Sequence, residues 1–177
     1  MKIAVCDDRP EHLKKIRELL GKYQQTRPGL ESQAEYFLSG AELLDQAEER
    51  GGYDLYLLDI LMPGENGISV GKRLRQMGKQ GELIFLTSSN DYAADSYEVR
   101  AFFYLLKPVE EEKLFRVLDQ AVEKLTQQEK KTLLLETREG TRCVPLARIL
   151  YAERAGRVMR CHCTDGVLDS QTLRMPF

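Results

Sequence analysis

Residues 55–64 read Leu-Tyr-Leu-Leu-Asp-Ile-Leu-Met-Pro-Gly: an apolar run that carries one acid, Asp59, and then breaks at Pro63-Gly64. A short apolar run bounded by turn residues is typical of a buried strand. A carboxylate at the end of such a strand is costly unless it is solvated, paired with a cation or bound to a metal. We therefore expect Asp59 to have a charged partner.

Polar side chains follow three other apolar runs in the same way. They are Asp7-Asp8 after residues 3–5, Thr87 after residues 83–86, and Lys107 after residues 102–106. In an open α/β sheet, the carboxyl ends of parallel strands form the ligand crevice. One edge would then carry three carboxylates, a hydroxyl and an ammonium, a set that suits a magnesium ion and a phosphoryl group.

Strand and helix patterns alternate through about residue 126. The expected strands are 2–6, 34–38, 54–58, 83–86 and 101–106, and the expected helices begin near residues 10, 40, 68, 91 and 110, the fourth running over 91–99. Five such units with short loops predict a parallel sheet covered on both faces.

In this order and spacing, the four motifs resemble the receiver domain of bacterial two-component response regulators, over about residues 1–126. The resemblance implies an α/β fold, a flavodoxin-like (βα)5 doubly wound parallel sheet of strand order 2-1-3-4-5. It also implies that Asp59 accepts a phosphoryl group from a sensor histidine kinase. A carboxylate can attack phosphorus and form an acyl phosphate.

The resemblance further implies a Mg²⁺ cofactor. Asp8 and Asp59 are its expected direct ligands, with Asp7 bound through water and the backbone carbonyl of Leu61 completing the site. A hard cation of this kind takes oxygen ligands and neutralises phosphoryl charge.

The remaining receiver positions have expected roles as well. Lys107 would pair with Asp59 at rest and with phosphoryl oxygens afterwards, and Thr87 would donate its hydroxyl to one of them. Tyr104 resembles the aromatic switch of the family, and the bond before Pro108 is expected to be cis. Each residue alone could be a turn, cap or packing residue, but their occurrence together at four strand ends favours the functional interpretation.

The chain changes character after the receiver-like segment. Residues 127–131 are polar and predict a linker. Residues 132–177 contain short strand-like runs separated by Glu139-Gly140, Ala155-Gly156 and Asp165-Gly166, which are typical hairpin turns. Residues 144–153 read Val-Pro-Leu-Ala-Arg-Ile-Leu-Tyr-Ala-Glu and are followed by Gly156-Arg157 and Thr164-Asp165-Gly166. These stretches resemble the first half of a LytTR-type DNA-binding domain, so we expect a truncated domain with a small core.

Charge gives weak support for a nucleic-acid partner. The whole chain has a net charge of -2; residues 132–177 hold seven arginines and five acids, or +2, which leaves -4 for the remainder. The arginines available for phosphate contacts are Arg138, Arg142, Arg154, Arg157 and Arg160. They are equally consistent with a solvated β surface, so the sequence assigns DNA contacts to none of them and DNA binding is expected of the complete output domain.

Nothing in the sequence predicts a membrane partner, because no apolar run approaches the roughly 20 residues that span a bilayer. The N-terminus reaches Asp7 too soon for a signal peptide, which favours a cytoplasmic protein.

Cys161-His162-Cys163 lacks a second ligand pair for a metal site. Buried reduced thiols are the favoured interpretation of these cysteines.

Three functions remain open. The first is a phosphorylation-controlled transcription regulator. The second is a receiver that acts through protein–protein contacts, including a possible homodimer, because the output domain is incomplete. The third is a Mg²⁺-dependent phosphohydrolase, which is disfavoured because Leu61 stands where haloacid-dehalogenase-type enzymes need an acid. We therefore expect no enzyme activity beyond the chain's own phosphorylation and dephosphorylation.

Overall fold

Five strands from the first part of the chain pair into one parallel sheet in the order β2-β1-β3-β4-β5, as the resemblance to receiver domains implies. The computed structural model describes residues 1–89, 91–92, 98–130, 132–137, 139–156, 158–170 and 173–174. The strands of this sheet are β1 (Lys2–Cys6), β2 (Gln33–Phe37), β3 (Leu55–Asp59), β4 (Glu82–Thr87) and β5 (Phe103–Leu106). The register sets Asp59, the last residue of β3, opposite Leu86 of β4.

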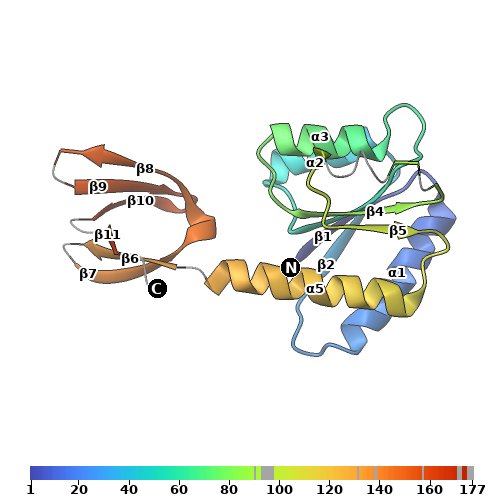
Figure 1. Ribbon diagram of the computed structural model, residues 1–177, viewed down its shortest axis with the longest axis horizontal. Coiled ribbons are helices and arrows are strands. Elements are labelled where there is room, and N and C mark those ends of the chain that lie inside the picture. The colour runs from blue at the N-terminus through green and yellow to red at the C-terminus, as the bar shows by residue number, and fades with distance from the viewer. Residues whose placement is uncertain are drawn as a thin grey trace. The chain divides into compact units, whose positions relative to one another are not determined.

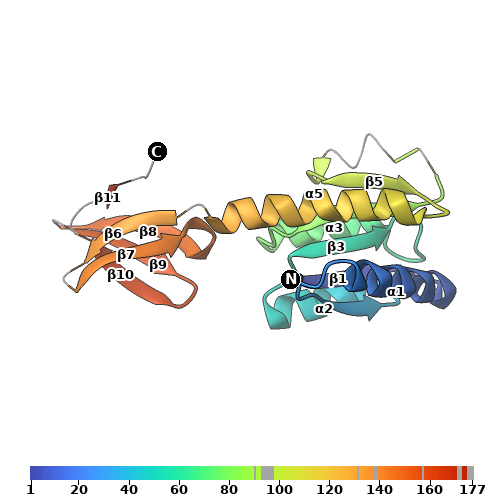
Figure 2. The same ribbon diagram turned by 90° about the horizontal axis from the view of Figure 1, so that it is seen from below.

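Helices cover both faces of the sheet (Figure 1). They are α1 (Pro10–Gln25) and α5 (Glu111–Lys130) on one face, and α2 (Gly40–Arg50) and α3 (Gly67–Gln76) on the other. Figure 2, seen from the side of α1 and α5, shows these two helices in front of the strands. Every residue of β3 and β4 is buried, as expected for central strands of a doubly covered sheet. These two strands are therefore a rigid base for the polar groups at their ends.

The helix ends follow the signals in the sequence. Pro10 occupies the first turn of α1. At the start of α2, the Ser39 hydroxyl accepts the backbone N–H of Glu42 at 3.2 Å, and the Glu42 carboxylate accepts the N–H of Leu38 at 3.3 Å. The capping box is thus present, although its return bond goes to Leu38 rather than to Ser39.

Two expected elements differ from the structure or lie outside it. The helix expected over 91–99 falls largely on residues 93–97, outside the described residues. Of the linker expected at 127–131, residues 127–130 belong to α5, and residue 131 lies outside the described residues.

Residues 122–177 form a second compact unit of antiparallel sheets. One sheet has the order β10-β9-β8 and the other β11-β6-β7. The elements are β6 (Thr132–Thr137), β7 (Gly140–Pro145), the 3-10 turn η1 (Leu146–Arg148), β8 (Ile149–Ala155), β9 (Val158–Cys163), β10 (Gly166–Ser170) and β11 (Leu173–Arg174). The hairpin predictions are confirmed, whereas η1 and β11 were not expected.

The core of the second unit is small. Among the described residues, its buried apolar side chains are Leu133, Leu135, Val144, Cys161 and Cys163. Cys161 and Cys163 are reduced, as the sequence predicts, and share the buried side of β9, while Cys143 is exposed. No helix in the described part of the chain has the length and apolar character needed to cross a membrane.

Candidate functional site

Four strands of the parallel sheet bring their polar ends to one edge. Asp7 follows β1, Asp59 ends β3, Thr87 ends β4 and Lys107 follows β5. Asp7, Asp59 and Thr87 are buried, so their polar groups depend on one another rather than on water. The edge predicted from the sequence is therefore assembled.

The Lys107 ammonium lies between two carboxylates. Its Nζ is 2.7 Å from Oδ2 of Asp59 and 2.6 Å from Oδ2 of Asp7. The pairing with Asp59 agrees with the expectation, whereas the contact with Asp7 was not foreseen. The Lys107 side chain is 12% exposed, so this cation compensates two buried negative charges. The peptide bond between Lys107 and Pro108 is cis, as expected.

Asp59 is a buried carboxylate with a hydrogen-bond partner for each of its oxygens. Burial raises the pKa of its carboxyl group, and the hydrogen bond and charge of Lys107 oppose that rise. The other oxygen, Oδ1, accepts the backbone N–H of Leu61 at 3.3 Å. Lys107 and Leu61 together fix the orientation of both carboxylate oxygens.

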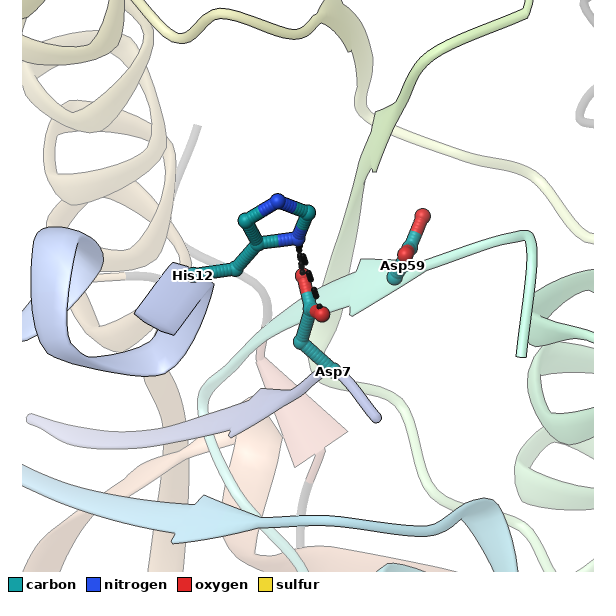
Figure 3. A group of neighbouring side chains, drawn as sticks. All are labelled: Asp7, His12 and Asp59. Carbon is teal, nitrogen blue, oxygen red and sulfur yellow. Dashed lines mark hydrogen bonds and ion pairs between the residues drawn. The ribbon is translucent and has the colours of Figure 1, made fainter. Parts of the chain in front are cut away.

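His12 belongs to this cluster and was missed in the sequence analysis. Figure 3 shows its ring beside Asp7, with Nδ1 turned toward the carboxylate. Nδ1 lies 3.1 Å and 3.2 Å from the two oxygens of Asp7 and 3.0 Å from Nζ of Lys107. A signal was present: Pro10, two residues after Asp8, begins α1, which puts residue 12 in the first helical turn beside the strand end.

Asp8 has an unusual environment. Its Oδ1 atom is buried and has no hydrogen-bond partner among the described residues. A buried carboxylate oxygen without a partner is costly, and a bound cation would satisfy it. The three carboxylates Asp7, Asp8 and Asp59 also match the oxygen-ligand preference of Mg²⁺.

The tightest group of possible ligand atoms is different from the expected set. Among the described residues, it comprises Asp7, His12 and Asp59, whose ligand atoms lie within 4.8 Å of one another. Asp8, expected as a direct ligand, is not in this group. The Leu61 side chain is exposed, and its carbonyl is the fourth ligand that the sequence predicts.

A hydroxyl pair lies at the end of β4. The Thr87 side chain is fully buried, and its Oγ1 accepts the backbone N–H of Ser89 at 3.4 Å. The Tyr104 hydroxyl donates to the backbone carbonyl of Ser89. Burial raises the pKa of Tyr104, and its hydrogen bond with Thr87 opposes that rise. The Tyr104 hydroxyl thus lies beside the strand end that holds Thr87.

The arginines of the second unit mostly have local partners. Arg142 pairs with Glu139 at 2.8 Å, Arg160 pairs with Asp169 through two bonds of 2.7 and 2.9 Å, and Arg154 donates to the carbonyl of Gly156. Arg138 and Arg157 lie outside the described residues. These contacts are those of a solvated β surface.

Comparison with known proteins gives the family. Residues 3–119 match the family model of the response regulator receiver domain. The chain belongs to this receiver domain family. Two curated relatives of the receiver are the sensory transduction protein LytT of Enterococcus faecalis, 29% identical, and the positive alginate biosynthesis regulatory protein of Pseudomonas aeruginosa, 32% identical. The alignments cover 72% and 68% of this chain but 50% and 47% of those proteins. The chain thus spans about half the length of the curated relatives it matches.

Solved structures agree with this assignment. The receiver domain of AraT from Geobacillus stearothermophilus is 26% identical with a TM-score of 0.62, covering 73% of this chain and 98% of that domain. The response regulatory domain of mrkE from Klebsiella pneumoniae has a TM-score of 0.63 at 24% identity, covering 72% of this chain and all of that one, and supports the fold alone.

Proposed function

We propose that this receiver accepts a phosphoryl group on Asp59 from a sensor histidine kinase, and that phosphorylation controls a DNA-binding output. The observation that carries the proposal is the Asp59 carboxylate at the end of a buried strand, 2.7 Å from the Lys107 ammonium. Asp7 and Asp8 add the negative charge that a divalent cation requires.

The reaction follows from this arrangement. An oxygen of Asp59 attacks phosphorus, the bond between phosphorus and the donor nitrogen breaks, and an acyl phosphate forms on Asp59. The Leu61 N–H holds Oδ1, which leaves Oδ2 as the oxygen released when Lys107 turns to the phosphoryl group. Lys107 and the Thr87 hydroxyl then donate to phosphoryl oxygens.

Mg²⁺ is the proposed cofactor. Asp8 and Asp59 would hold it directly, with Asp7 through water and the Leu61 carbonyl as a further ligand. When bound, this ion neutralises charge on the phosphoryl oxygens. The unpartnered Oδ1 of Asp8 supports this assignment.

The signal would leave the site through Thr87 and Tyr104. A donation from Thr87 to the phosphoryl group draws its hydroxyl away from Tyr104, which frees the aromatic side chain to change position. The existing bonds of Thr87 with Ser89 and of Tyr104 with Ser89 support this coupling.

For the output, the names of the relatives favour transcription control. They include a transcriptional regulatory protein LytR of Staphylococcus aureus, 29% identical over 125 residues. By analogy, residues 132–177 would be part of a LytTR-type domain that binds DNA when complete. A receiver that acts in the cytoplasm through protein contacts, homodimerisation included, is the alternative. The apolar Leu61 disfavours turnover as a phosphohydrolase, and we propose no enzyme activity beyond the chain's own phosphoryl chemistry.

Incubation with acetyl phosphate and Mg²⁺, followed by intact-mass measurement, tests the proposal. The wild-type chain should gain the mass of one phosphoryl group, and Asp59→Asn should not. Asp54→Asn is the matched control, because Asp54 precedes β3 at its opposite end and its carboxylate accepts the Lys2 N–H. Full labelling of Asp59→Asn would refute the assignment.

A further inference from the structure

The Lys107 ammonium has three N–H donors and no acceptor. Two of them face Oδ2 of Asp7 and Oδ2 of Asp59, at 2.6 Å and 2.7 Å. The third possible partner is Nδ1 of His12, at 3.0 Å. These three groups surround a cation that is largely removed from water, so each donor has a partner of its own.

The other neighbours of His12 decide the role of its Nδ1. Asp7 already accepts a bond on each oxygen, from Lys107 on Oδ2 and from the backbone N–H of Arg9 on Oδ1 at 3.0 Å. A carboxylate has further acceptor sites, so these two bonds do not decide the direction of the bond at Nδ1; the Lys107 ammonium, which can only donate, decides it. The Lys107 donor has no other acceptor within reach among the described contacts, so Nδ1 acts as an acceptor and the ring proton lies on Nε2.

We propose that His12 is a positioning residue for Lys107. By accepting the third N–H, its Nδ1 keeps the ammonium at this strand edge, within reach of the phosphoryl oxygens, when Asp7 turns toward a cation and Lys107 leaves Oδ2 of Asp59. It thereby raises the rate at which Asp59 accepts a phosphoryl group. This inference rests on the proposed function. It concerns a side chain from α1, whereas Lys107 follows β5, so it couples two elements distant in sequence.

A second role for His12, as a metal ligand, is weaker. Its Nδ1 and the oxygens of Asp7 and Asp59 lie within 4.8 Å of one another. The Lys107 ammonium, however, already contacts all three groups, and a metal ion held by the three would have to displace it. An imidazole ligand would also favour zinc over magnesium, which makes this role measurable.

Two substitutions separate these roles. His12→Asn presents an amide oxygen near the place of Nδ1 and so retains an acceptor, whereas His12→Leu retains a comparable volume without one. With acetyl phosphate at saturating Mg²⁺, we expect His12→Leu to accept phosphoryl about tenfold more slowly, the effect of losing one bond to a charged group. We expect His12→Asn to stay within about threefold of wild type. Equal rates in all three proteins would overturn the proposal.

Nuclear magnetic resonance of the full chain provides a readout that does not depend on phosphorylation. The ¹⁵N signal of His12 should show an unprotonated Nδ1 in wild type. The Lys107 ammonium signal should be protected from exchange in wild type and in His12→Asn but broadened in His12→Leu. A wild-type chain that takes no phosphoryl group would refute the proposed function, while these signals would still test the contact.

Calorimetric titration with Mg²⁺ and with Zn²⁺ tests the competing role. If His12 only positions Lys107, the affinity of His12→Leu for each ion should stay within about twofold of the wild-type affinity for that ion. Loss of a direct ligand would lower the affinity far more. A tenfold or greater loss of Zn²⁺ affinity in His12→Leu would overturn the proposal in favour of metal ligation.

Discussion

Asp8 and Asp7 are adjacent acids in opposite situations. Oδ1 of Asp8 is buried without a partner, whereas Asp7 is paired with Lys107. Asp8→Ala removes an unsatisfied oxygen and repulsion between carboxylates, so we expect the metal-free protein to become more stable by about 1 kcal/mol. The rise in melting temperature that Mg²⁺ causes in wild type should disappear. Thermal unfolding with and without Mg²⁺ measures both effects.

Asp7→Ala is the matched comparison and should act in the opposite direction. It leaves the buried Lys107 with one carboxylate fewer, and breaking a buried pair costs about 3 kcal/mol. A loss of stability in Asp8→Ala as large as that in Asp7→Ala would contradict the proposed difference between the two acids.

The sequence was informative about Asp59 and Lys107 because each ends an apolar run, and the parallel fold brings strand ends together. His12 carried no such signal on its own. Its role depends on a rotamer and on the reach of Lys107 across the edge, which are tertiary properties. The unpartnered oxygen of Asp8 is likewise a result of packing that composition and spacing do not reveal.

At the scale of the element, Gly67 allows the start of α3 to lie close to the backbone at the end of β3. A Cβ atom built on Gly67 would lie 2.1 Å from the backbone oxygen of Asp59. Backbone atoms cannot yield as a flexible side chain can, so Gly67→Ala should destabilise the protein by at least about 2 kcal/mol. Denaturant unfolding measures the loss.

Gly21 provides the control for this substitution. It lies in α1, and a Cβ there would meet nothing within 4 Å. Gly21→Ala should therefore stabilise the protein by roughly 0.5–1 kcal/mol through helix propensity. If Gly67→Ala and Gly21→Ala changed the free energy of unfolding by similar amounts, the close contact of Gly67 with the Asp59 backbone would not limit stability.

The ion pair between Asp119 of α5 and Arg27, which follows α1, should make the free energy of unfolding depend on pH. Hydrogen bonds from Arg27, at 2.7 and 3.1 Å, and from Tyr23, at 2.8 Å, lower the pKa of Asp119. A lowered pKa in the folded state gives stability that is present above the unfolded pKa, near 4, and is lost as pH falls through the folded pKa. Asp119→Asn should thus be less stable than wild type at pH 7, with the difference closing below about pH 4.

The size of that difference is limited by solvent. Asp119 is 45% exposed, so screening keeps the contribution below about 1 kcal/mol and salt should reduce it. Urea unfolding at a series of pH values measures it. A stability gap that widens toward acid pH would contradict the sign argued here.

At the scale of the whole molecule, the sequence predicted the receiver better than the second unit. Period and turn residues were enough to predict five strands in a parallel sheet, because its central strands β3 and β4 are buried throughout, whereas the strand order followed from the resemblance to receiver domains. In the second unit, strands with many exposed positions leave their pairing to weak signals. The short β11 and the turn η1 were missed for this reason.

The same physical difference predicts how residues 132–177 behave. Leu150, Tyr151 and Val167 are 65%, 55% and 54% exposed, so large apolar side chains contribute little burial. At about 25 cal/mol per Å² of buried apolar surface, so small a core does not offset about 1.5 kcal/mol of ordering entropy per residue. A peptide of residues 132–177 should therefore not fold as a monomer and should bind DNA without sequence preference.

Circular dichroism and sedimentation of that peptide, with residues 1–126 as the control, measure folding and association. The control should unfold cooperatively, because its strands and helices contain two separate buried clusters.

In the full chain, amide hydrogens of β8 and β10 should exchange much faster than those of β3 and β4, since opening a small core costs less free energy. DNA binding by the peptide should weaken steeply with salt, because contacts to phosphate alone release counterions. A monomeric, folded peptide that distinguishes one DNA site from random sequence would show that these strands are sufficient as a domain.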